Sequence, residues 1–78
     1  MSTTYYVVLS FIETDEGDLI AEEPREAQSR GQAEAAARLL KGQKAGVIAF
    51  SRTGNPDVGE FQPAVEIVRY GRVPDDLE

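Results

Sequence analysis

Residues 4–13 constrain the fold of this chain more than any other segment, because they are apolar on both sides of the strand that they predict. The run Thr-Tyr-Tyr-Val-Val-Leu-Ser-Phe-Ile-Glu is rich in aromatic and β-branched residues, as β-strands are. Side chains alternate along a strand, so one face carries Tyr5, Val7, Leu9 and Phe11, and the other carries Tyr6, Val8, Ser10 and Ile12. A strand with one face in water alternates apolar and polar residues, so this one is predicted to be central.

The next elements are a short strand and a helix. A turn at Gly17 leads to residues 19–23, which read as an edge strand ended by Pro24. Ser29 and Gln32 have the spacing of a capping box, which predicts a helix that begins after Ser29. An apolar stripe follows at helical spacing, formed by Ala33, Ala36, Ala37 and Leu40.

Two more strands are predicted after the helix, in residues 46–52 and 61–70, with a loop at 51–61 between them. The order β-β-α-β-β predicts an α+β fold: a four-stranded antiparallel sheet in the order 2-1-3-4, with one helix packed on one face. We expect residues 1–76 to form a single small domain. The closing Leu77-Glu78 is consistent with the remnant of an expression tag.

A sheet has two faces, and the single helix can cover only one of them. If the Tyr5 set lies under the helix, Tyr6, Val8 and Ile12 point away from it. The strand at 46–52 adds either Ile48 and Phe50 or Val47 and Ala49 to that face, depending on the register. The interface candidates are Tyr6, Val8, Ile12, Ile48 and Phe50. An apolar patch of this kind on a small protein is typical of an interface, so we expect a second copy or another protein to cover it, through the open face or an edge strand. The alternative is that loops or the C-terminal tail fold over this face, or that single apolar residues stay exposed.

Composition excludes several chemistries. The 78 residues include no cysteine and no histidine, which rules out disulfides, thiolate–imidazole zinc sites, and Ser-His-Asp or Cys-His catalysis. General acid–base catalysis would depend on carboxylates, lysine or tyrosine, whose ordinary pKa values lie far from neutral. We therefore expect no enzyme, no catalytic residue and no cofactor. A domain this small often needs a stabilising aid, and oligomerisation is the one that remains.

The net charge of −6 argues against non-specific binding of nucleic acid or of an anionic membrane. Residues 27–56 nevertheless carry five basic residues and one acid, which leaves a small-anion or nucleic-acid binder as the alternative function. Its candidate residues are Arg52, Thr53, Gly54, Lys41 and Lys44. The competing interpretation is a plain strand connection with a solvated Arg52.

Two other groups of residues have simpler interpretations. The acids Glu13, Asp15, Glu16 and Asp18 surround one turn without a calcium-loop signature, so we expect a solvated turn and no metal site. Tyr5, Tyr6 and Tyr70 lack the neighbouring basic pattern of base-stacking sheets, and packing in the core or an interface is expected instead.

The chain begins without a signal-peptide pattern and holds no apolar run long enough for a membrane span, so the cytoplasm is the expected compartment. The chain resembles a family of small bacterial proteins in most of its length. The resemblance rests on Tyr-Tyr-Val-Val at residues 5–8, the helix at 32–41, Lys-Ala-Gly-Val-Ile-Ala-Phe-Ser-Arg-Thr-Gly-Asn-Pro at 44–56 and Arg-Tyr-Gly-Arg-Val-Pro-Asp-Asp-Leu at 69–77. No activity, cofactor or substrate is assigned to that family, so the resemblance implies no function.

Overall fold

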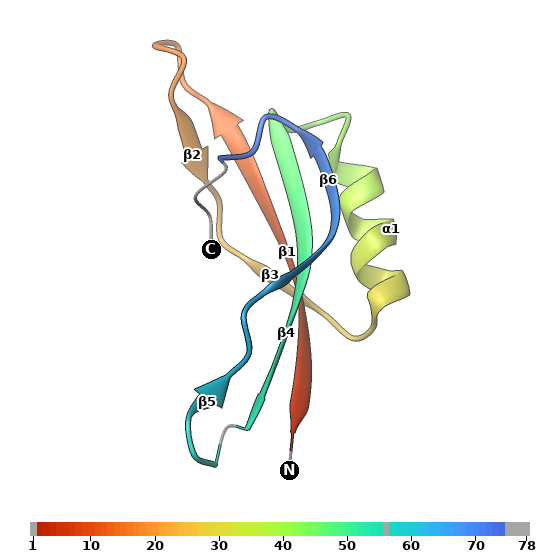
Figure 1. Ribbon diagram of the computed structural model, residues 1–78. Coiled ribbons are helices and arrows are strands. Elements are labelled where there is room, and N and C mark those ends of the chain that lie inside the picture. The colour runs from red at the N-terminus through yellow and green to blue at the C-terminus, as the bar shows by residue number, and fades with distance from the viewer. Residues whose placement is uncertain (1, 56, 75–78) are drawn as a thin grey trace.

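A computed structural model of the protein describes residues 2–55 and 57–74. In these ranges the chain forms one helix and one curled antiparallel sheet of six strands (Figure 1). The elements are β1 (Thr3–Glu13), β2 (Leu19–Ala21), β3 (Arg25–Ala27), α1 (Arg30–Leu40), β4 (Gly46–Asn55), β5 (Glu60–Phe61) and β6 (Val65–Gly71). Leu77 and Glu78, which resemble a tag remnant, lie outside the described residues.

The two long strands β1 and β4 form the centre of the sheet. They pair antiparallel from Thr3 opposite Gly54 to Phe11 opposite Gly46. Both β2 and β3 pair with the outer side of β1, and both β5 and β6 pair with the outer side of β4. The predicted α+β fold with an antiparallel sheet and the first strand at its centre is confirmed.

The expected number of four strands is wrong, because each edge of the sheet is formed by two short strands. After β2 pairs with the end of β1, Pro24 interrupts the ladder, and β3 resumes the pairing opposite Tyr6 to Val8. On the other edge, β5 and β6 are separated in the same way by a segment that contains Pro63. Proline has no backbone N–H to donate to a ladder. The predicted strand at 61–70 therefore divides around Pro63, and beyond the predicted strand at 19–23 a further strand, β3, forms after Pro24.

The helix begins where the capping residues predicted. The Oγ of Ser29 accepts a hydrogen bond from the backbone N–H of Gln32 at 3.2 Å, and Ser29 has extended backbone angles. The side-chain oxygen of Gln32 accepts from the backbone N–H of Gln28 at 3.1 Å, one residue before the cap. These bonds satisfy amide groups that would otherwise be unpaired at the start of α1.

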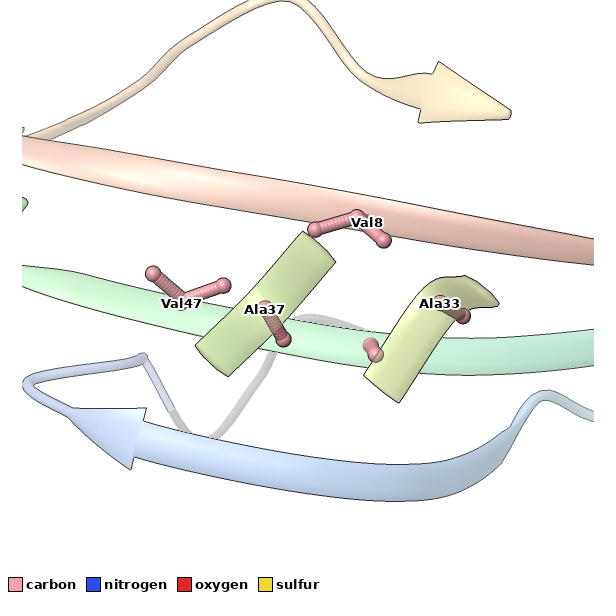
Figure 2. Close-up of a cluster of buried hydrophobic side chains, with 5 residues drawn as sticks. Val8, Ala33, Ala37 and Val47 are labelled. Atoms are coloured by element: carbon pink, nitrogen blue, oxygen red, sulfur yellow. The ribbon is translucent and has the colours of Figure 1, made fainter. Parts of the chain in front are cut away.

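The core lies between α1 and the centre of the sheet. Its fully buried members are small: Val8, Ala33, Ala37, Val47 and Ala49 (Figure 2). Around them pack partly buried side chains that include Tyr6, Leu40 and Tyr70. A helix that presents alanines approaches the sheet closely, so only small side chains fit beneath it.

Candidate interaction surface

The side of the sheet opposite α1 carries the larger apolar side chains. Val8 pairs with Ala49 in the core beneath the helix, so the neighbouring pairs Val7–Phe50 and Leu9–Ile48 point the other way. We call this surface the open face and define it by the residues that β1 and β4 contribute: Tyr5, Val7, Leu9, Phe11, Ile48, Phe50 and Arg52.

The expected facing of the first strand is therefore inverted. Tyr6 and Val8 were expected to point away from the helix, but both lie on its side, and Val8 is 2% exposed in the core. Ile12 shares that side and is exposed, beside Ile20 of β2. The reason is the alanine stripe, which leaves room for valine and alanine beneath it and none for phenylalanine or leucine. Ile48 and Phe50 lie on the side away from α1.

One end of the open face is covered by the chain that follows β6. Phe11 and Ile48 are each only 3% exposed. Gly46 pairs with Phe11, and a Cβ on Gly46 would overlap the carbonyl group of Arg72. The backbone of Arg72 therefore lies directly on the open face at this end. Figure 1 shows the same segment leaving β6 and passing the ends of β4 and β1 toward β2.

A turn and two contacts position that crossing segment. Gly71 has a φ of +69°, a turn that other residues adopt with strain. The backbone N–H of Arg72 donates to the carbonyl oxygen of Ala45 at 2.9 Å. The Arg72 guanidinium forms an ion pair with Glu13. The sequence alternative in which the C-terminal tail folds over this face is thus correct for one end of it.

The middle and the far end of the open face remain more accessible. Val7, Leu9 and Phe50 are half-buried. At the far end the ring of Phe61 lies over Gly54 and 6.2 Å from the ring of Tyr5. The Arg52 guanidinium is 5.6 Å from the Phe61 ring centroid, and its Nε donates to the carbonyl oxygen of Gln62 at 3.3 Å. Tyrosine, phenylalanine and arginine are enriched at the cores of protein interfaces.

The residues proposed for anion binding do not converge in the structure. The Thr53 hydroxyl meets that of Thr4 at 2.9 Å, on the opposite side of the sheet from Arg52, and Gly54 is buried. The Lys41 ammonium lies 5.0 Å from the ring centroid of Tyr70, and Lys44 pairs with Glu22. Arg52 lies six residue steps along β4 from Gly46, roughly 20 Å at ~3.3 Å per step. The two lysines precede Gly46 in the chain, so they form no common site with Arg52.

The predicted loop at 51–61 is shorter than expected. Residues 51–55 continue β4, and the turn is confined to the residues before β5. In the acidic turn, Thr14 accepts amide hydrogen bonds from Gly17 and Asp18, through its carbonyl and its hydroxyl respectively. Within the described ranges no three acids gather in a way that would hold a metal ion.

A polar network on the helix side links three segments of the chain. The hydroxyl of Ser10, which is buried, donates to Oε1 of Glu22 at 2.8 Å, and the Lys44 ammonium donates to Oε2 at 3.1 Å. These hydrogen bonds, with that from Lys44 the larger cause, lower the pKa of Glu22 below its ordinary value of 4.5. Glu22 lies in the segment between β2 and β3, so the network holds this segment against β1 where the edge of the sheet is interrupted.

Glu22→Gln is expected to make the protein less sensitive to acid. A carboxylate whose pKa is depressed by folding stabilises the protein above the unfolded pKa, and this stabilisation is lost as the pH falls through the folded value. The wild type should therefore lose more stability than Glu22→Gln when the pH falls from 6 to below the ordinary value of 4.5. Urea unfolding at each pH measures this, with the exposed neighbour Glu23→Gln as control. Equal losses in wild type and Glu22→Gln would contradict the assignment.

Comparison with known proteins adds no family to this description. No protein-family model, no curated protein and no solved structure matches the chain. The resemblance to a family of small bacterial proteins therefore stays an expectation from the sequence. No helix in the described part of the chain has the length and apolar character that crossing a membrane requires.

Proposed function

We propose that the protein is a non-catalytic protein-interaction module that forms a homodimer through the open face. The observation that carries the proposal is that this face presents Val7, Leu9 and Phe50 half-buried beside the cluster of Tyr5, Arg52 and Phe61. Tyrosine and arginine are enriched at binding hot spots, and neighbouring contacts keep water away from them. The apolar side chains of the open face can serve as such neighbouring contacts.

The extent of exposed surface supports a second copy as the occupant. A compact monomer of 8.5 kDa is expected to expose about 4,650 Å². This chain exposes 5346 Å² and measures 44 × 23 × 17 Å. The excess of roughly 700 Å² approaches the roughly 800 Å² that each partner buries in an interface of standard size.

The edges of the sheet are poorly suited to the same role, which favours the face over an edge strand. Pro24 and Pro63 divide the two edges into short pieces, the longest of which is β6. The strand β6 contains a β-bulge: Ala49 of β4 pairs with Val68 and Phe50 with Glu66, so β6 has one unpaired residue between them. Bulges, prolines and short strands are the devices by which proteins prevent edge-to-edge pairing.

Leu9→Gln is expected to weaken the dimer by at least about tenfold, a loss of ~1.4 kcal/mol, because the substitution removes apolar surface from both sides of a symmetric interface. The control is Leu39→Gln on α1, where the side chain is 74% exposed and lies outside the open face. Sedimentation equilibrium measures both dissociation constants. Thermal unfolding shows whether each variant is folded, and Val7→Thr, which nearly conserves volume, provides a milder second variant.

A strictly monomeric wild type at millimolar concentration would exclude the proposal, and so would equal weakening by the Leu9 and Leu39 substitutions. The salt dependence of binding distinguishes self-association from binding to a basic partner. Two copies that each carry a charge of −6 repel one another, so raising salt from about 20 mM to about 500 mM, which shortens the Debye length from roughly 20 Å to roughly 4 Å, should strengthen self-association.

A further inference from the structure

We infer that residues 71–74 form a strap that competes with the partner for one end of the open face. This inference rests on the proposed function, because it assigns a regulator to the same surface. The strap turns at Gly71, crosses Gly46 and reaches Glu13, and it covers the end where Phe11 and Ile48 lie. Both of these side chains belong to the open face by their register, and both would join the interface if the strap moved.

The place where the strap crosses the sheet, which we call the crossing point, depends on two glycines that face each other. Gly46 and Gly71 are partners in the β4–β6 ladder. A side chain on Gly46 would occupy the place of the Arg72 carbonyl, and one on Gly71 would overlap the carbonyl of Ala45. The chain therefore passes over the sheet backbone at a closeness that only glycine permits.

The attachment of the strap beyond this crossing is weak enough to be displaced. It consists of one backbone hydrogen bond, from Arg72 to Ala45, and one ion pair, from Arg72 to Glu13. The Arg72 side chain is 61% exposed, and exposed ion pairs contribute little to stability and are screened by salt. Val73 and Pro74, the last described residues of the strap, are apolar and half-buried. Apolar burial is not directional, so a partner can replace it.

The strap is tested with two full-length variants and two matched controls. Gly46→Ala places a methyl group where the carbonyl group of Arg72 lies. Its control is Gly42→Ala, where a Cβ meets no atom within 4 Å. Arg72→Gln removes the ion pair to Glu13, and its control is Arg30→Gln, which removes the exposed pair to Glu34 on α1. The readouts are the dimer dissociation constant by sedimentation equilibrium and hydrogen exchange of the Arg72 amide by NMR.

We expect Arg72→Gln to tighten the dimer about two- to fivefold for each strap, the range for an exposed ion pair, and Gly46→Ala to tighten it further. The Arg72 amide should exchange faster in both variants, and the controls should match the wild type. Unchanged or weaker association in both variants, or an Arg72 amide already unprotected in the wild type, would overturn the strap. If the wild type dimerises and the variants do not differ from it, only the strap fails. If the wild type and every variant stay monomeric, the proposed function fails with it.

Discussion

Ala37→Leu is expected to destabilise the protein by about 3 kcal/mol or more, the upper part of the range for overpacking a core. Ala37 is fully buried and belongs to the same core cluster as Val47 of the sheet (Figure 2). Three added carbon atoms would force the helix away from the sheet and open the contacts of Ala33 as well. A domain of this length has a total stability of about 4–12 kcal/mol, so the loss is a large fraction of it.

The measurement for Ala37→Leu is thermal unfolding followed by circular dichroism. At roughly 4–8 °C per kcal/mol for a domain of this size, the Tm should fall by at least about 12 °C. The control is Ala35→Leu in the same helix, where the side chain is exposed and leucine is nearly as good a helix former as alanine. Its stability should change by less than about 0.5 kcal/mol. Similar Tm values for the two variants would show that α1 does not pack against the sheet through Ala37.

Val47→Ala is expected to cost about 2–3 kcal/mol. Val47 is the largest fully buried side chain in the described part of the chain, and its two methyl groups contribute about 1.6 kcal/mol of transfer free energy before the cavity is counted. The buried neighbours are Val8 and the alanines at positions 33, 37 and 49, whose short side chains cannot extend to refill the space.

Val65→Ala on β6 is the matched control for Val47→Ala, because it is the same substitution in the same sheet at a position that is 62% exposed. Both variants lose a valine from a strand, and the main difference between the two positions is the burial of Val47 at the centre of the sheet. Urea denaturation at neutral pH should give a midpoint well below the wild type for Val47→Ala and one near it for Val65→Ala. Equal midpoints would be incompatible with a core centred on Val47.

Local signals in the sequence predicted the elements well where one residue decides the outcome. Ser29 and Gln32 fix the start of α1, because their side chains satisfy amides that the helix leaves unpaired. The predicted edge strand at 19–23 is shorter in the structure, because β2 ends at Ala21, three residues before Pro24, and the resumption of pairing in β3 was not predicted. The signal was the length of β1, whose eleven residues need partners that a three-residue strand cannot supply.

The facing of β1 could not be predicted from its own residues, because both of its faces are apolar. The decision depends on what the helix presents, and the alanines at positions 33 and 37 select the smaller face, that of Val8, over the larger face of Phe11. Phe61 was missed in the candidate surface because its place beside Tyr5 follows from the pairing of β5 with the end of β4. No local pattern encodes that long-range register.

The breaks at Pro24 and Pro63 also bear on how the molecule behaves when it is crowded. A protein with accessible apolar side chains can form cross-β fibrils through the edges of its sheet, because the unpaired backbone groups of an edge strand template the addition of further chains. Here neither edge offers a continuous row of amides. If the protein pairs through the open face, as we propose, one copy saturates that surface, and growth stops at a closed pair instead of continuing into a filament.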